Sequence, residues 1–148
     1  MKRFSFSLEQ VRRWRESERD KEEARLQALF AELNQLERVR VELGNAAAKA
    51  EESVRPTPEA PLPPIQELQA LDSYRCYVRR ECQRLVGLRS RLETRIATQR
   101  RILVEAERKL EVLDILREER LAEWKRDLDK EQEDLVAELV VARWARAC

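Results

Sequence analysis

The fold is decided by residues 55–64, which read RPTPEAPLPP. All five prolines of the 148-residue chain fall in this stretch. Each proline removes a backbone N–H donor and clashes with the preceding helical turn, so a helix cannot cross it. We therefore expect a loop over residues 55–64, with one helix before it and another after it.

The first helix is expected to run from about residue 8 to residue 54. Ser7 followed by Gln10 fits a capping box, which starts the helix near Leu8. Apolar residues then recur at spacings of three and four, as on one face of a helix. They are Leu26, Leu29, Leu33, Leu36, Val39 and Leu43.

The second helix, over about residues 65–145, has the more regular pattern. Eleven positions alternate spacings of four and three over five heptads, and nine of them are apolar, which indicates a coiled-coil seam. They are Val78, Cys82, Leu85, Arg89, Leu92, Ile96, Gln99, Leu103, Ala106, Leu110 and Leu113.

Two helices joined by a short loop pack antiparallel. We therefore predict an all-α fold, a long antiparallel two-helix coiled-coil hairpin that forms a single unit over residues 1–148, with the second helix longer than the first. With the turn near residue 60, residue i of the first helix faces about residue 120−i of the second. This register places Leu33 near Leu85 and Leu8 near Leu113.

The unequal helix lengths leave residues 114–148 without a partner from the first helix. At ~1.5 Å per residue the helices measure roughly 70 Å and 120 Å. The excess carries an apolar stripe, which indicates a site for a different protein, with self-association or disorder of the last turns as alternatives. The stripe consists of Leu116, Leu121, Trp124, Leu128, Leu135, Leu139 and Trp144.

The composition argues against an enzyme. The chain has no His and only two isolated Gly, at positions 44 and 87, so it lacks a His general base and a glycine-rich phosphate loop. The three Cys, at positions 76, 82 and 148, have neither the spacing nor the His partners of a zinc site. We expect no cofactor and no metal. No apolar run is long enough for a signal peptide or a membrane span.

The net charge of +1 hides an uneven distribution along the chain. Residues 65–104 carry nine Arg and four acidic residues, whereas residues 105–148 carry nine basic and thirteen acidic residues. An acidic protein partner is the more natural interpretation, no nucleic acid is expected, and a merely solvated helix face remains the alternative. The candidate contacts are Arg80, Arg84, Arg91 and Arg95.

Two stretches resemble the flagellar FliJ family, and the likeness covers nearly the whole chain. The first, at the N-terminus, is Met1-x-x-Phe4-x-Phe6-x-Leu8-Glu9-x-Val11-x-x-x-Arg15. The second is Leu113-x-x-Leu116-Arg117-Glu118-x-Arg120, followed by Trp124 and then Glu131-Gln132-Glu133.

The resemblance implies a non-enzymatic component of the bacterial flagellar type III protein export apparatus. Such a protein looks like the stalk of a rotary ATPase: the ends of the hairpin enter the export ATPase ring and promote its hexamerisation and activity. The resemblance also implies contacts with the membrane-embedded export gate and with export chaperones, and a cytoplasmic location peripheral to the inner face of the cell membrane. A self-associating coiled-coil scaffold, an injectisome stalk protein and a holdase chaperone are the alternatives.

Together, the uncovered stripe and the resemblance place the contact with the ATPase ring at the end of the hairpin where both termini lie. Trp suits such a site because it combines a large apolar area with a hydrogen-bond donor. The candidate residues are Phe4, Leu8, Val11, Trp14, Arg15, Leu121, Trp124, Leu128, Leu135 and Leu139.

Overall fold

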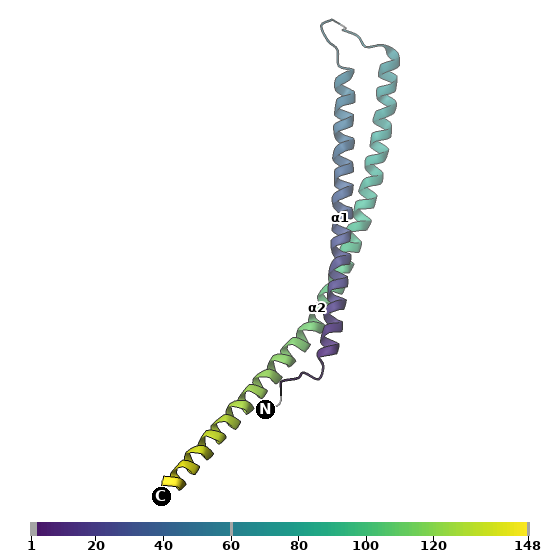
Figure 1. Cartoon of the computed structure of the whole chain (residues 1–148). Coiled ribbons are helices and arrows are strands. Elements are labelled where there is room, and N and C mark those ends of the chain that lie inside the picture. The colour runs from purple at the N-terminus through teal and green to yellow at the C-terminus, as the bar shows by residue number, and fades with distance from the viewer. Residues whose placement is uncertain (1–2, 60, 148) are drawn as a thin grey trace. The chain divides into compact units, whose positions relative to one another are not determined.

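The computed structural model describes residues 3–59 and 61–147; Met1, Lys2, Ala60 and Cys148 lie outside the described residues. Two helices make up the described fold, α1 (Glu9–Ser53) and α2 (Ile65–Ala147). They pack against each other and are joined by the proline-rich segment (Figure 1). The predicted all-α hairpin with a longer second helix is therefore confirmed.

Backbone hydrogen bonds define where each helix begins. The Leu8 carbonyl accepts from the Arg12 N–H at 2.9 Å, so α1 starts at Glu9, one residue after the start that the Ser7 capping box predicts. The Pro64 carbonyl accepts from the N–H groups of Glu67 and Leu68 at 3.0 and 3.2 Å. Proline suits this place because its missing N–H would have no intrahelical partner in the first turn.

The described chain divides into two compact units, each built from a stretch of α1 and a stretch of α2. The first unit, residues 23–102, contains the proline-rich connection. The second combines the N-terminal residues up to 22 with the residues from 103 onward. We describe the two units separately.

The core is a single apolar seam between the helices. In the 23–102 unit the buried side chains are Leu26, Leu29, Leu85, Leu92 and Ile96, and in the second unit Leu110 is buried among the described residues. Each of the eleven seam positions predicted for α2 is buried or half-buried, which confirms that pattern. Among the seam residues predicted for α1, Leu26 and Leu29 are buried, Leu33, Leu36 and Leu43 are half-buried, and Val39 is the most exposed at 37%.

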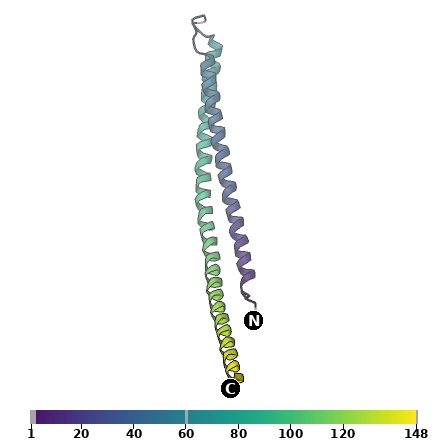
Figure 2. The same ribbon diagram turned by 60° about the vertical axis from the view of Figure 1, so that its left-hand side comes forward.

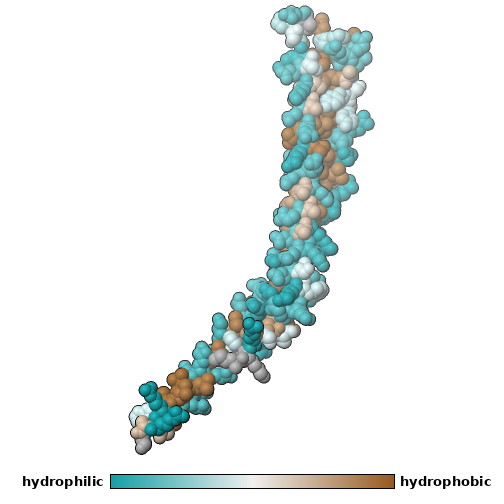
Figure 3. Space-filling model, viewed as in Figure 1, coloured by the Kyte–Doolittle hydropathy of each residue, from teal (hydrophilic) through white to brown (hydrophobic). Residues whose placement is uncertain are grey.

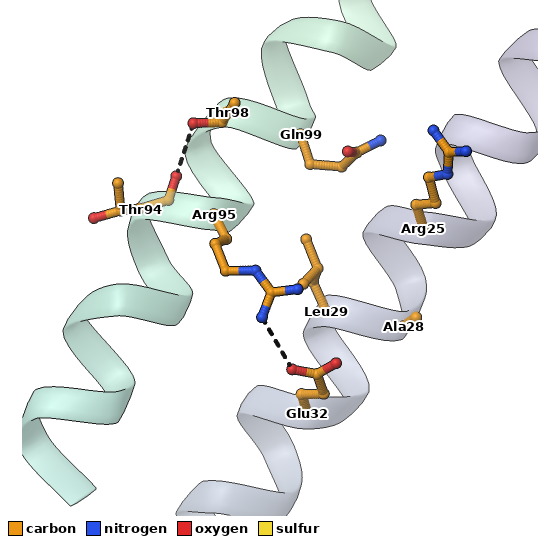
Figure 4. Close-up of a pocket in the computed structure, with 8 residues that line it drawn as sticks. All are labelled: Arg25, Ala28, Leu29, Glu32, Thr94, Arg95, Thr98 and Gln99. Carbon is orange, nitrogen blue, oxygen red and sulfur yellow. Dashed lines mark hydrogen bonds and ion pairs between the residues drawn. The ribbon is translucent and has the colours of Figure 1, made fainter. Parts of the chain in front are cut away.

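Two seam positions of α2 are polar, and each is half-buried. The Arg89 guanidinium reaches out of the seam, with Nη1 3.4 Å from Glu37 Oε2 of α1 and Nε 3.0 Å from Glu93 Oε1. Gln99 lies beside Leu29 in a shallow hollow between the helices (Figure 4). A long polar side chain can occupy a seam when its stem packs and its head reaches water or a partner.

Ion pairs between the helices fix the register of the 23–102 unit. Glu51 pairs with Arg75 at 3.0 Å and Glu37 with Arg89 at 3.4 Å. Glu32 pairs with Arg95 at 3.7 Å, as Figure 4 shows. The two residue numbers of each pair add up to 126 or 127, so residue i faces about residue 126−i. The predicted register of 120−i is wrong, and Leu33 lies level with Glu93 instead of Leu85.

The second unit has the same register. Arg12 pairs with Asp114, and Glu9 with Arg117, so both pairs add up to 126. Leu8 accordingly lines a groove with Leu116, not with Leu113 as predicted.

The shift in register arises at the proline-rich connection. Glu51 lies two residues before the end of α1, whereas its partner Arg75 lies ten residues into α2. The first turns of α2 therefore extend past the last residue of α1. Prolines favour an extended backbone, so the connection rises along the helix direction before α2 begins.

The outer faces of the helices are hydrophilic. Pairs three or four residues apart hold opposite charges together, such as Lys109–Glu105 at 3.0 Å and Arg120–Glu123 at 3.1 Å. Each such pair stabilises a helix by roughly 0.2–0.5 kcal/mol.

No described helix has a stretch apolar and long enough to cross a membrane.

We expect Leu92→Asp to destabilise the protein by at least about 3 kcal/mol, because it places an unpaired carboxylate in the seam where Leu92 is 6% exposed. Thermal unfolding followed by circular dichroism measures this. Ser90→Asp, two residues away on the exposed face, is the matched control and should melt almost as the parent does. Equal melting of the two variants would contradict a seam at Leu92.

Candidate functional site

The last part of α2 stands alone. From residue 129 to residue 147 every side chain is exposed. In both views of the ribbon no other described segment lies beside this stretch (Figures 1 and 2). We call residues 129–147 the lone end of α2.

The lone end carries large apolar side chains in water. Leu135 is 55% exposed, Leu139 69% and Trp144 73%. Leu135 and Leu139 are four residues apart and therefore share one helix face. Apolar surface also gathers at this end of the molecule in the space-filling view (Figure 3). Val136, Val140 and Val141 are also exposed on the lone end, at 60%, 50% and 68%. An exposed apolar stripe of this kind marks an interaction site. The three valines lie outside the heptad stripe, so its spacing does not predict them.

The N-terminal segment covers the preceding part of α2. The Phe4 and Trp124 rings are tilted by 57° with their centroids 6.0 Å apart. Phe6 and Leu8 line the same groove, with Leu116 on the α2 side. The side chains of Leu116, Leu121, Trp124 and Leu128 are half-buried. The expectation that residues 114–128 lie uncovered is therefore wrong, because an extended segment outside α1 packs on α2.

Charged pairs hold the start of α1 against α2 next to this groove. Arg12 Nε donates to Asp114 Oδ1 at 2.6 Å, and this hydrogen bond raises the pKa of Arg12 above its ordinary value. Glu9 Oε2 lies 3.4 Å from Arg117 Nε. Arg12 also lies near Glu9 and Glu16 on its own helix, so the guanidinium is surrounded by carboxylates.

Three of the predicted ring-binding residues, Val11, Trp14 and Arg15, lie on the first turns of α1; Val11 and Trp14 are exposed and Arg15 is half-buried. Val11 is 43% exposed and Trp14 53%. The Arg15 guanidinium lies over the Trp14 ring, 4.6 Å from its centroid, and also pairs with Glu18 at 3.0 Å. Local partners therefore hold Arg15 in place.

The predicted ring-binding residues thus fall into three groups. Phe4 and Leu8 meet Trp124 in the groove, and the half-buried side chains of Leu121 and Leu128 belong to the same stretch of α2. Val11, Trp14 and Arg15 do not line this groove. Leu135 and Leu139 lie beyond it, on the lone end.

The arginines of the predicted acidic-partner site differ in how they are paired. Arg84 donates a short hydrogen bond to Glu81, and this bond lowers the pKa of Glu81. Arg95 pairs across the seam with Glu32 (Figure 4). Arg80 and Arg91 are exposed, and no residue of the described chain pairs with them. The Arg95–Glu32 pair could not be predicted from the sequence, because the register across the seam decides it, whereas Arg84 and Glu81 are three residues apart on the same helix.

The hollow of Figure 4 offers little chemistry of its own. Thr98 Oγ1 donates to the Thr94 carbonyl at 3.1 Å, as hydroxyls commonly do inside helices.

Cys76 is exposed and Cys82 half-buried, and both are free; Cys148 lies outside the described residues. Within residues 3–59 and 61–147 no group of three His, Cys, Asp or Glu side chains could hold a metal ion.

The contact between Phe4 and Trp124 can be tested by fluorescence, with Trp14→Phe and Trp144→Phe leaving Trp124 as the single emitter. We expect Phe4→Ala to shift the emission to longer wavelength, because water then reaches the ring, and to cost about 1 kcal/mol of stability. Ser5→Ala, at an exposed neighbouring position, is the control. Identical spectra for the two variants would show that the N-terminal segment does not cover Trp124.

Comparison with known proteins identifies the chain at the family level. Neither the curated proteins nor the solved structures give a significant match. The family model described as "Flagellar FliJ protein" matches residues 4–147, which is nearly the full length. The chain therefore belongs to the FliJ family, and at that level it is a component of flagellar protein export.

Proposed function

We propose that the protein is the stalk of the flagellar export ATPase: it inserts into the ATPase ring and promotes the assembly and activity of the hexamer. The observation that carries the proposal is the lone end of α2, whose apolar side chains have no covering segment within the described chain. A single helix with such a surface is narrow enough for a ring pore to surround.

Mass action explains how such a stalk activates its partner. A ligand that binds the hexamer and not the separate subunits shifts the equilibrium toward the hexamer. Burial of one Leu side chain contributes roughly 1.5–3 kcal/mol, so Leu135 and Leu139 alone can supply a useful part of this free energy.

The three groups of predicted residues then have different roles. Leu135 and Leu139 enter the ring first, since they lie on the lone end. The Phe4–Trp124 contact lies at the level where the N-terminal segment joins α2, and it limits how far the single helix extends. Val11, Trp14 and Arg15 lie on the first turns of α1 and contact the rim of the pore.

The arginine-rich stretch is proposed to bind acidic surfaces of the export gate or of export chaperones. Arg80 and Arg91 supply most of this attraction, because each is exposed and without a partner in the described chain. Arg84 and Arg95 contribute less, since Glu81 and Glu32 already neutralise them. The protein is accordingly proposed to be cytoplasmic and to reach the inner face of the membrane through its partners.

We expect Leu135→Ser combined with Leu139→Ser to abolish stimulation of the export ATPase while the free energy of unfolding changes by less than about 1 kcal/mol, because both side chains are exposed in the free protein. Circular dichroism melting and an ATP hydrolysis assay measure the two effects. This pair suits the test better than Trp124 and Leu128, whose half-buried side chains also contribute to packing.

The control is Val86→Ser combined with Val112→Ser, which changes two equally exposed valines elsewhere on α2. It should leave stimulation intact. Full stimulation by the Leu135/Leu139 variant would contradict the proposal, and a large drop in its melting temperature would mean that the lone end is covered in solution.

For the acidic partner we expect Arg80→Gln combined with Arg91→Gln to weaken binding to the cytoplasmic domain of the export gate by about tenfold at low salt, because two unpaired charges are removed. Arg84→Gln combined with Arg95→Gln changes the net charge equally and should cost less than about threefold. Calorimetric titration at two salt concentrations compares them. Equal losses for the two pairs would contradict the assignment.

A further inference from the structure

The two halves of the lone end carry opposite charges. Residues 129–138 contain five acidic residues and one Lys, whereas residues 139–147 contain two Arg and no acidic residue. Every side chain of the lone end is exposed, and no residue of the described chain pairs with Asp129 or Arg143. The lone end therefore presents unpaired charge to a partner, beside its apolar surface.

One edge of the apolar stripe on the lone end carries an acidic, an apolar and a basic residue in turn. Asp129, Val136 and Arg143 are seven residues apart, so they lie in a row along the helix. The row borders the stripe that contains Leu135 and Leu139, since Val136 directly follows Leu135 and Arg143 lies one turn beyond Leu139. Apolar and charged contacts are thus available on the same side of the helix.

A second helix that runs antiparallel matches this edge. When Val136 lies level with Val136 of a second copy, Asp129 lies level with that copy's Arg143, and Arg143 lies level with its Asp129. A parallel helix would instead bring equal charges to the same level. Charged residues beside the seam set the orientation of paired helices, so these charges favour the antiparallel pair.

The same register closes the apolar surface over the length that is uncovered. Leu135 of each copy then lies within one turn of Leu139 of the other, since they are only about two residues apart along the axis. Residue 147 of one copy reaches about residue 126 of the other. The overlap therefore ends close to the place where Phe4 packs on Trp124, and it needs no surface that the chain already covers.

We propose that a second copy of the chain docks on the lone end, so that the lone ends of two copies form an antiparallel pair. Two equal contacts between Asp129 and Arg143 lie at the ends of a centre made by Leu135, Val136 and Leu139. Reciprocal contacts of this kind close a two-fold dimer, which is the commonest symmetry of homo-oligomers. All of these residues lie within residues 129–147 of α2, so the pair needs no other part of the chain.

The short overlap makes the dimer weak. Residues 129–147 span roughly 28 Å of helix, and small interfaces are typical of transient complexes. By mass action the dimer forms at high protein concentration and dissociates in dilute solution. It covers the side chains that are proposed to enter the ATPase ring, so one chain cannot be in the dimer and in the ring at the same time.

The test is sedimentation velocity of the full chain without any ATPase, under reducing conditions, which exclude disulfide dimers. With protein concentrations up to about 1 mM, we expect the sedimentation coefficient to rise toward that of a dimer. Asp129→Arg and Arg143→Asp should each weaken self-association about tenfold or more, because like charges then meet at both contacts.

An equimolar mixture of these two variants should associate again. The Arg introduced in one copy then meets the Asp introduced in the other, and the second contact is the original pair of Arg143 and Asp129. Only an antiparallel pair restores opposite charges at both contacts.

Matched controls change the charge equally on the other side of the helix. Lys130 and Asp134 lie nine and five residues from Leu139, which turns them away from the proposed contact, and both are exposed. Lys130→Asp and Asp134→Arg should therefore associate as the parent does, alone and mixed.

A parent chain that stays monomeric over the whole concentration series would overturn the proposal. So would a mixture of Asp129→Arg and Arg143→Asp that does not associate, or controls that lose association as strongly as these variants do. Since no ATPase is present, these outcomes are independent of the proposed stalk function.

Discussion

The apolar seam between α1 and α2 is the interaction on which the rest of the structure depends. Two helices can bury only the one edge that each turns toward the other, and the buried set is accordingly small, with Leu85, Leu92 and Ile96 as its most covered members. Polar residues enter the seam only where their heads can leave it, as Arg89 does toward Glu37. Side chains outside the seam can be charged without disturbing the core. The charged outer surface and the uncovered end of α2 are therefore the surfaces available to bind other molecules.

The unequal lengths of the helices determine which part of α2 is exposed. Because α2 has 83 residues and α1 has 45, α1 cannot cover the whole of α2. The remaining part of α2 is either covered by another segment of the chain or exposed to water. The chain uses both solutions. The extended N-terminal segment packs Phe4 on Trp124, and beyond that contact the lone end stays in water with Leu135, Leu139 and Trp144 exposed. Apolar surface that costs free energy in the isolated protein is available to stabilise a complex.

The charged residues of the 23–102 unit fall into two groups, those paired across the seam and those without a partner in the described chain. Arg75, Arg89 and Arg95 meet Glu51, Glu37 and Glu32 across the seam and so help to fix its register. Arg80 and Arg91 have no such partner in the described chain. A stretch that looks uniformly basic in the sequence therefore contains residues that hold the hairpin together and residues that remain available for binding.

The sequence by itself determined the two helices, their limits to within a residue or two, and the seam of α2, because prolines and heptad spacing act locally and leave a direct trace in the residue order. Only the tertiary structure decided the register of the two helices, because the register depends on how far the proline-rich connection rises before α2 begins. The register in turn decides which Arg of α2 meets which Glu of α1. The same holds for the N-terminal segment: residues 3–6 have no helical pattern, and nothing in their order reveals that Phe4 reaches Trp124. Contacts between residues far apart in the chain depend on packing geometry, so the extent of the uncovered helix could be measured only in the folded chain.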